Sequence, residues 1–415
     1  MAYLNRRQFL RKLSALAAIP FFLPASRRIT PILSMQAQLY DVYVASLSTP
    51  VTNVQQVIAS AGGIQRFIDF DDIVVLKPNG QWPNQGYTHT ECIKALIDVI
   101  LARPGGFGGE IILAEHVHRA PPPASDNALS TKYCWNMSVS NRLNNWPEMN
   151  YFQLVNDYKS RGIPIVTAIP LYDSGQGTFD RVSGPSAIKP GRHGWVVSSY
   201  TTSANKRKIQ LSYPILRSSY SGNSVDLKNG VWKDGSYTGQ KVKLIFLPTL
   251  NNHSAYNHQD YAGPTSALKC HLGIQDFNVP SGSYTLHGVG YTSPYSPQAM
   301  GESVGQLITQ LLKPAFYMTC AIFTGYRGRT DPLAAYTKTV GLCTDPVTLD
   351  YWMCKNILFP VDTVQIFMNP DNNNNLRKAL IGCQSKGVGT LIESEMVVHQ
   401  WFPEKEIRAI LPLIP

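Results

Sequence analysis

The sequence predicts an α/β fold, with a parallel or mixed central sheet, flanking helices and a β-rich insertion. Short apolar runs take turns with segments of helical periodicity. The apolar runs are continuous rather than alternating, as in strands that are buried on both faces of a sheet. A later section rich in Tyr, Ser, Thr and Val contains the turn pairs Asn229-Gly230 and Asp234-Gly235. Such pairs indicate antiparallel hairpins.

The predicted strands and helices follow one another along the chain. We predict strands at residues 40–47, 72–79, 108–118, 241–250, 316–325 and 390–397, and in the second half of 150–173. We predict helices at residues 51–68, 88–106, 300–312, 344–358 and 369–389, and in the first half of 150–173. Thr88 or Thr90 is the expected cap of the second helix, and Asp345 with Pro346 opens the helix at 344–358.

The chain divides into a leader and a body. Residues 1–37 form a signal segment, and residues 38–415 form a single large α/β domain or, alternatively, two lobes. The β-rich insertion occupies about residues 192–243. Residues 119–150, rich in Pro, Ser and Asn, are expected to form a long loop.

The leader resembles an export signal. It holds six Lys or Arg residues and no acid, and an apolar run from Leu13 to Ala25 follows its charged start. Arg6 and Arg7 are followed by Gln-Phe-Leu, which resembles a twin-arginine signal. We therefore expect the twin-arginine export machinery as a partner and a periplasmic or envelope location, with membrane contact only through the leader if it stays uncleaved. The alternative is a basic amphipathic helix that lies on the body.

The charge of the chain does not favour a nucleic-acid partner. The formal net charge is +10, from 37 Lys and Arg against 27 Asp and Glu. Six of these basic residues lie in the leader, which leaves 31 against 27, or +4, for the rest of the chain. Most of the excess therefore belongs to the leader rather than to a binding surface.

The seven cysteines are widely spaced and include no C-x-x-C pair. This spacing predicts neither a zinc ribbon nor an iron–sulfur cluster. Disulfides are compatible with an oxidising compartment, although an odd number leaves at least one cysteine without a partner in this chain.

Polar side chains occur at the carboxyl ends of three of the predicted strands. Lys77 and Asn79 lie at the end of the second strand, Glu115 lies near the end of the third, and His253 follows the strand at 241–250. In open α/β sheets, ligands bind outside the carboxyl ends of the strands. If these strands are parallel, the three groups therefore lie on one edge of the sheet and form a single candidate site. Lys77 would hold an anionic group or, if desolvated, form a covalent link, and a solvated lysine is the alternative.

A histidine pair raises the hypothesis of a metal ion as cofactor. His116 and His118 are two residues apart on a strand and point the same way, whereas Glu115 points the opposite way. With His253, these histidines are the candidate metal ligands. Histidines that only cap the sheet edge are the alternative.

The segment GPTSALKCHLG, residues 263–273, combines a turn with a short helix. Thr265 or Ser266 can cap this helix, whose free N–H groups would suit an anion. Lys269 lies about one turn later and is expected to reach the same anion. His271 is expected to serve as a ligand or proton carrier, and Cys270 to be buried and inert.

These motifs together resemble the family known as domain of unknown function 362. In chain order they are Lys77-Pro78-Asn79, the helix led by Thr88-His89, Glu115, Pro248 with His253, Gly263-x-Thr265-x-x-x-Lys269 with Gly273, and Asp345-Pro346-Val347-x-Leu349-Asp350. The resemblance spans roughly residues 70–355. It implies an α/β fold and the location of a site, but no reaction.

The chain departs from this family's pattern at several points. Asn251 and Asn252 stand where relatives usually carry a lysine before the histidine, and Cys270 stands where an asparagine often follows the lysine. Many relatives carry an iron–sulfur module, for which this chain has no cysteine spacing, so that role is not carried over.

We therefore expect an exported protein whose site binds an anionic ligand or a metal cofactor, with or without catalysis. The catalytic candidates are Lys77, His253, Lys269 and His271, and the ligand-binding candidates are Asn79, Thr265 and Asp350. The alternatives are a non-catalytic binding protein that uses the same site and a structural envelope protein anchored by its leader.

Overall fold

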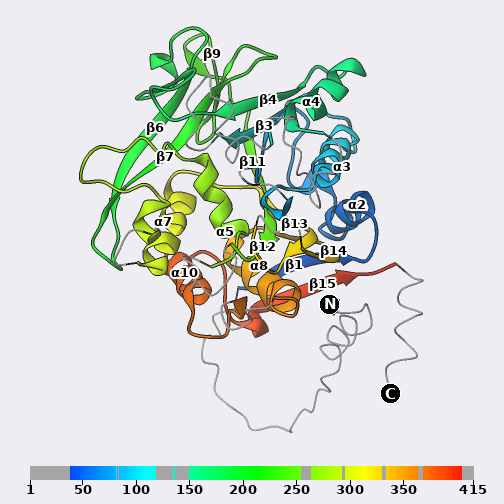
Figure 1. The fold of residues 1–415 in the computed structure, drawn as a ribbon. Helices are drawn as coiled ribbons and strands as arrows, with labels where there is room; N and C mark the ends of the chain where they lie inside the picture. Colours follow the sequence, from blue (N-terminus) through cyan, green and yellow to red (C-terminus); the bar gives the residue numbers. More distant parts are fainter. Residues whose placement is uncertain are drawn as a thin grey trace, which may run out of the picture.

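The structure is a computed structural model. It describes residues 38–80, 82, 84–117, 134–135, 149–253, 263–291, 295–329, 333–362 and 368–403. A mixed central sheet carries helices on both faces, and a second sheet lies beside it (Figure 1). The predicted α/β fold is therefore confirmed. The leader lies outside the described residues.

The central sheet has nine strands in the described part of the chain, in the order β15-β1-β14-β13-β11-β2-β3-β4, with β12 beside β13. Their bounds are β1 (Tyr40–Ser46), β2 (Ile73–Pro78), β3 (Glu110–His116), β4 (Val166–Leu171), β11 (Val242–Leu247), β12 (Thr249–Asn251), β13 (Phe316–Gly325), β14 (Ala335–Cys343) and β15 (Met396–Trp401). β14 runs antiparallel to both of its neighbours, and the other pairings are parallel. The carboxyl ends of β2, β3 and β11 therefore lie at the same edge.

The helices and short turns cover both faces of this sheet. They are α2 (Pro50–Ser60), α3 (Thr90–Leu101), α4 (Tyr151–Ser160), α5 (Ala267–Cys270), η5 (His271–Ile274), α6 (Gly288–Tyr291), α7 (Pro297–Gln310), α8 (Pro346–Met353), η6 (Cys354–Leu358) and α10 (Asn375–Gln384). Polar caps fix several helix starts: the Asp345 carboxylate accepts from Thr348 N at 2.8 Å, and Pro346 takes the first helical position, as the sequence predicts.

Two apolar cores lie on opposite faces of the central sheet. Val74 and Leu76 of β2 pack in the core that α2, α3 and α4 share. Val75, between them, packs in the core that α5, α7, α8 and α10 share with the second sheet. The sheet therefore has α2, α3 and α4 on one face and α5, α7, α8 and α10 on the other (Figure 1).

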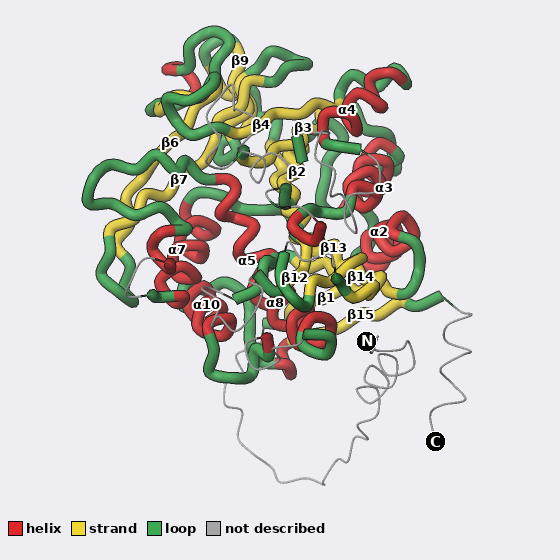
Figure 2. Tube along the Cα trace, viewed as in Figure 1, coloured by secondary structure: helices red, strands yellow, loops and turns green. Residues whose placement is uncertain are grey.

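The second sheet has the order β10-β9-β8-β7-β6-β5. Figure 2 labels three of its strands, β6, β7 and β9. Its strands are β5 (Phe179–Arg181), β6 (His193–Thr201), β7 (Lys208–Arg217), β8 (Ser224–Asp226), β9 (Gly230–Lys233) and β10 (Ser236–Tyr237). Asp234 and Gly235 form the predicted tight turn between β9 and β10, with φ angles of 48° and 85°. The insertion is β-rich as expected, but its first strand begins at Phe179, earlier than the predicted residue 192.

Three local predictions were wrong or incomplete. The cap of α3 is His89, without a side-chain bond, because the Thr88 hydroxyl donates to the Leu247 carbonyl instead. The final strand begins at Met396 rather than near residue 390, because Glu393–Glu395 form a 3₁₀ turn. The sequence analysis did not identify β14 as a strand. Within the described ranges, no helix combines the length and the apolar character needed to cross a membrane.

Candidate functional site

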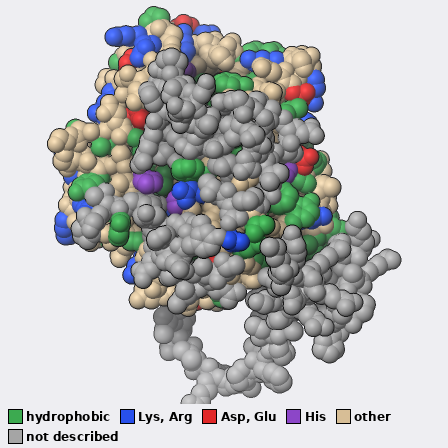
Figure 3. Space-filling view, viewed as in Figure 1, with side chains coloured by type: hydrophobic (Ala, Val, Ile, Leu, Met, Phe, Trp, Pro, Cys, Tyr) green, Lys and Arg blue, Asp and Glu red, His purple; other side chains and the backbone are tan. Residues whose placement is uncertain are grey.

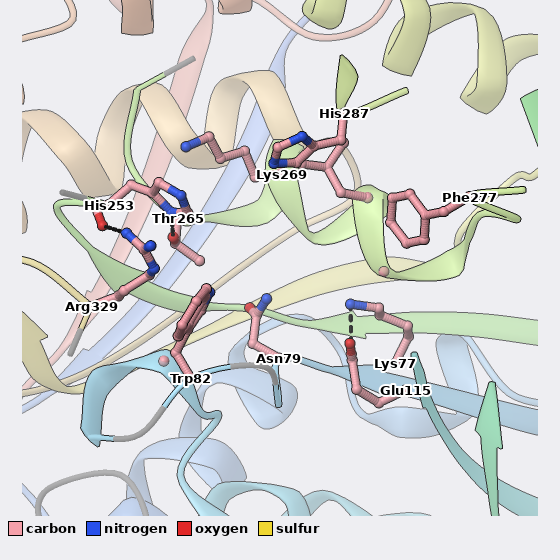
Figure 4. Close-up of a pocket in the computed structure, with 13 residues that line it drawn as sticks. Lys77, Asn79, Trp82, Glu115, His253, Thr265, Lys269, Phe277, His287 and Arg329 are labelled. Carbon is pink, nitrogen blue, oxygen red and sulfur yellow. Dashed lines mark hydrogen bonds and ion pairs between the residues drawn. The ribbon is translucent and has the colours of Figure 1, made fainter. Parts of the chain in front are cut away.

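A cavity lies at the edge where β2, β3 and β11 end (Figure 4). It encloses about 600 Å³ of empty space, counted with the space at its mouth. Six residues that the sequence singled out line it: Lys77, Asn79, Glu115, His253, Thr265 and Lys269. They meet because β11, β2 and β3 are adjacent and parallel, so that residues far apart in the chain leave the sheet together.

Lys77 and Glu115 form a buried ion pair in the cavity wall. The Lys77 Nζ atom lies 2.7 Å from Glu115 Oε2, and Cys270 Sγ accepts from the same ammonium at 3.6 Å. A glycine is required opposite them, because a Cβ atom on Gly273 would lie 2.5 Å from Lys77 Nζ and 2.7 Å from Glu115 Oε1. The turn of η5 thus presses its backbone onto the pair.

The two members of this pair differ in their ionisation. Burial raises the pKa of Glu115 to about 7, although the Lys77 ammonium beside it opposes the shift. Burial by itself lowers the pKa of Lys77, but Cys270 and Glu115 outweigh this effect and the pKa is raised. Lys77 is therefore an ammonium at neutral pH, which disfavours the covalent link that the sequence left open and favours the role of a fixed positive charge.

Asn79 is held so that one end of its amide faces the cavity. Its Oδ1 atom accepts from Thr249 N at 3.0 Å, and its backbone carbonyl accepts from the Tyr151 hydroxyl. Its backbone N–H donates to Thr88 Oγ1 at 2.9 Å. Because Oδ1 is engaged, the amide N–H groups remain to be directed at a ligand.

His253 is fixed by neighbours on both sides. Its Nδ1 atom lies 2.9 Å from Thr265 Oγ1, and its backbone carbonyl accepts from the Arg329 guanidinium. Burial lowers its pKa well below 6.5, and the charges of Lys269 and Arg329 add to the effect. His253 is therefore a neutral imidazole at physiological pH, able to pass a proton or accept a hydrogen bond.

Lys269 is buried and lies beside the turn that precedes its own helix. Its Nζ atom donates to the Gly263 carbonyl at 2.6 Å. Gly263 has a φ of +78°, and a Cβ there would lie 2.9 Å from the backbone of Leu376. The turn therefore requires glycine. Its carbonyl oxygen holds the Lys269 ammonium beside the cavity.

The start of α5 binds an anion of the protein itself. Asp350 Oδ1 accepts from Ala267 N at 2.8 Å, and Oδ2 accepts from Leu268 N at 2.8 Å and from Ser266 Oγ at 2.6 Å. The sequence predicted that these N–H groups would be open to a ligand and that Asp350 would bind one. Both expectations were wrong, since Asp350 is 1% exposed and does not line the cavity.

His271 and Cys270 belong to the core rather than to the cavity. His271 Nδ1 lies 3.0 Å from the Leu268 carbonyl and Nε2 lies 3.0 Å from the Tyr317 hydroxyl. A carbonyl only accepts, so Nδ1 carries the proton, and burial lowers the pKa of His271 to about 3. Cys270 is buried, and burial raises the pKa of its thiol to about 12. His271 is thus placed to hold α5 on β13 rather than to meet a ligand.

His116, one of the two histidines of the proposed pair, does not line the cavity. His116 faces away from it, with Nε2 3.4 Å from Asp173 Oδ1 and its ring edge-to-face with Phe277. Glu115, pointing the opposite way on the strand, lines the cavity instead. His118 lies outside the described residues. Among the described residues, no group of three or more His, Cys, Asp or Glu is arranged to hold a metal ion.

Sequence reasoning missed six residues that line the cavity: Trp82, Gly86, Leu272, Phe277, His287 and Arg329. Two of them carried a usable signal. Trp82 lies in the loop that follows β2, and Arg329 follows β13, whose carboxyl end lies at the same edge because β13 is parallel to β11. Phe277 and His287 come from the irregular chain after η5, for which the sequence offers no periodic pattern.

The cavity lining is predominantly positive. Lys77, Lys269 and Arg329 contribute three cations, whereas Glu115 is the one carboxylate among the described lining residues. In Figure 3, histidine and Lys or Arg surfaces lie next to one another near the centre of the face shown. Such a lining attracts an anion, and burial strengthens the attraction because little water screens it.

No family model, no curated protein and no solved structure matches this chain. The resemblance to the domain of unknown function 362 family therefore depends on the motifs described above.

Proposed function

We propose that this protein is exported and binds a small anion in the cavity. The observation that carries the proposal is the convergence of Lys77, Lys269 and Arg329 on one cavity whose described lining includes a single carboxylate. That carboxylate, Glu115, neutralises Lys77. Lys269 and Arg329 each donate to a backbone carbonyl oxygen, and both line the cavity. An anionic ligand would meet these positive charges there.

The leader supports the location. Arg6 and Arg7 precede an apolar run in a segment without acids, as in twin-arginine signals. That route carries folded proteins, so the cavity would be complete before export. The ligand would then be bound either in the cytoplasm or after translocation.

Titration calorimetry at low ionic strength tests the binding proposal. Acetate, benzoate and phosphate are the probes, and Lys269→Ala and Arg329→Ala are the variants. We expect at least one probe to bind and each variant to weaken it by about tenfold or more, since a charge-assisted hydrogen bond contributes about 1.5–3 kcal/mol. Lys159→Ala and Arg217→Ala, at exposed positions, are the matched controls and should bind as the wild type does. No binding, or equal losses in the controls, would overturn the proposal.

A second candidate function is acid–base catalysis on the bound anion. It is favoured by Glu115, whose pKa of about 7 lets it give or take a proton at neutral pH, and by the neutral His253. Native mass spectrometry of protein purified from the envelope fraction would identify a co-purified ligand. Conversion of that ligand by the wild type, and binding without conversion by Glu115→Gln, would indicate an enzyme. Return of the ligand unchanged by the wild type would indicate a binding protein.

A further inference from the structure

The cavity has two chemically different walls. Asn79 and Trp82, from the loop after β2, present hydrogen-bond donors. Leu272 and Phe277, from the chain after α5, present apolar surface. Figure 4 shows Trp82 and Phe277 on opposite sides of the space that the lining residues surround. An anion bound here therefore meets donors at one side and hydrocarbon at the other.

Trp82 carries a donor that the described part of the chain leaves unsatisfied. Its indole Nε1 atom is buried without a hydrogen-bond partner there. Its ring is fixed by the Arg329 guanidinium, whose central carbon lies 4.4 Å from the ring centroid. Figure 4 shows the Nε1 edge of the ring directed toward the cavity. A buried N–H without an acceptor is costly, so this atom marks the place of a ligand oxygen.

Asn79 adds a second donor next to the first. Its Oδ1 atom is occupied by Thr249 N, and within the described ranges its Nδ2 atom has no partner. Two neutral donors thus stand three residues apart in one loop and line the same cavity as the cations Lys269 and Arg329. Neutral N–H donors with flanking cations suit the two oxygens of a carboxylate.

Phe277 forms a rigid apolar wall. Its backbone N–H donates to Asp173 Oδ1 at 2.6 Å, and its ring packs edge-to-face on His116, with centroids 4.9 Å apart and an interplanar angle of 89°. Both contacts fix the ring before any ligand arrives. Leu272 extends the same surface. A ring that is already fixed loses little conformational entropy when an apolar group packs on it, so more of the contact energy stabilises the complex.

We propose that the ligand is an organic carboxylate with a ring-sized apolar body, rather than a bare inorganic anion. The inference rests on the proposed anion binding and adds the chemical class of the ligand. The carboxylate lies against Trp82 Nε1, Asn79 Nδ2 and the cations, and the apolar body packs on Phe277 and Leu272.

The test compares four anions on the full chain by titration calorimetry. Benzoate and cyclohexanecarboxylate carry a ring, acetate carries the carboxylate alone, and phosphate carries charge without hydrocarbon. We expect both ring carboxylates to bind about tenfold or more tightly than acetate and phosphate, because burying a ring against Phe277 adds more than about 1.4 kcal/mol. Acetate or phosphate binding as tightly as benzoate would overturn the inference while leaving anion binding in place. A protein that binds none of the four would overturn both.

Substitutions of Phe277 and Trp82 test the roles assigned to the apolar wall and to the donor wall. Phe277→Leu and the more severe Phe277→Ala should reduce the preference for benzoate over acetate, with the loss confined to benzoate. Trp82→Phe keeps a ring and removes only the N–H donor, so it should weaken benzoate and acetate alike by about tenfold. Trp232→Phe, in β9 of the second sheet, is the matched control. If Trp82→Phe binds both carboxylates as the wild type does, the assigned role of its Nε1 atom is wrong.

Discussion

Lys77 Nζ lies 2.7 Å from Glu115 Oε2 in an ion pair whose side chains are only 1% and 4% exposed. Both residues belong to neighbouring parallel strands, and both line the cavity. Removing two charges from water is expensive, so a hydrophobic pair of similar volume would usually be at least as stable. The pair is therefore better explained by the chemistry of the cavity than by stability.

Lys77→Met should destabilise the protein by about 3 kcal/mol at pH 8, because it leaves the Glu115 carboxylate buried without its counter-charge. The free energy of unfolding in urea measures the change. The double variant Lys77→Met/Glu115→Leu should recover most of the loss. Lys94→Met is the matched control, since its ion pair with Asp98 is well exposed, and it should cost less than about 1 kcal/mol. A double variant that is no more stable than the single one would contradict this account.

Glu115 should make the protein less stable as the pH rises from about 4.5 to about 7. Its folded-state pKa is raised from 4.5 to about 7, so the folded state binds more protons than the unfolded state in this window. Stability then falls with rising pH, and the penalty is complete above pH 7. The buried histidines act in the opposite direction below about pH 6.5, since burial lowers their folded-state pKa values from 6.5.

The contribution of Glu115 is isolated by difference. Urea unfolding of the wild type and of Glu115→Gln at several pH values should show the wild type losing stability relative to the variant between pH 4.5 and 7. A difference that does not change with pH would mean that Glu115 titrates normally.

Gly273→Ala should disrupt the cavity wall. The added Cβ would lie 2.5 Å from Lys77 Nζ and 2.7 Å from Glu115 Oε1, so the pair or the η5 turn must move. We expect a loss of about 1–3 kcal/mol in the free energy of unfolding and weaker binding of any anion that the wild type binds. Gly184→Ala is the matched control, because no atom lies within 4 Å of its added Cβ. Equal stability of the two variants would show that the Lys77–Glu115 pair or the η5 turn can move aside without loss of stability.

Asp350→Ala should destabilise the protein more than the loss of an ordinary helix cap. It removes three hydrogen bonds at the start of α5 and leaves two buried N–H groups without acceptors, which we expect to cost about 2–4 kcal/mol. Thr49→Ala, at the exposed start of α2, should cost about 1 kcal/mol. Thermal unfolding of both variants provides the comparison. A smaller loss for Asp350→Ala would imply that a ligand or water already shares these donors.

Replacing Arg6 and Arg7 with lysine should keep the protein in the cytoplasm, because a twin-arginine signal depends on both guanidinium groups. Cell fractionation and immunoblotting measure the distribution. Arg27→Lys/Arg28→Lys, which replaces the same number of arginines beyond the apolar run, is the control and should be exported normally. Export of the Arg6→Lys/Arg7→Lys variant would exclude this route.

The sequence was informative where short-range physics decides the outcome. Continuous apolar runs identified β2, β3 and β11 because a strand buried on both faces cannot alternate. Once these strands are parallel, their exits meet, which is why Lys77, Asn79 and Glu115 could be grouped before any coordinates were known. Strand alternation likewise placed Glu115 and His116 on opposite sides, although it did not reveal which side faced the cavity.

Within residues 263–273, Thr265 and Lys269 line the cavity as predicted, whereas the predictions for His271 and for an open helix start failed. Lys269 and His271 are two residues apart, and residues two apart on a helix point in nearly opposite directions. The Lys269 ammonium reaches the Gly263 carbonyl at the cavity, and the His271 ring reaches Tyr317 in the core. The open helix start was filled by Asp350, which lies 83 positions from Ala267 in the chain and reaches it through the packing of α8 on α5.

By itself, the sequence determined β2, β3 and β11 and the polar residues at their ends, because burial on both faces of a strand is encoded in a local pattern. Only the tertiary structure decided which side chains line the cavity and which are buried in the core. Phe277, His287 and Arg329 enter the site from irregular chain, and no local pattern encodes the contacts made there. Those contacts arise from the close packing of segments far apart in the sequence.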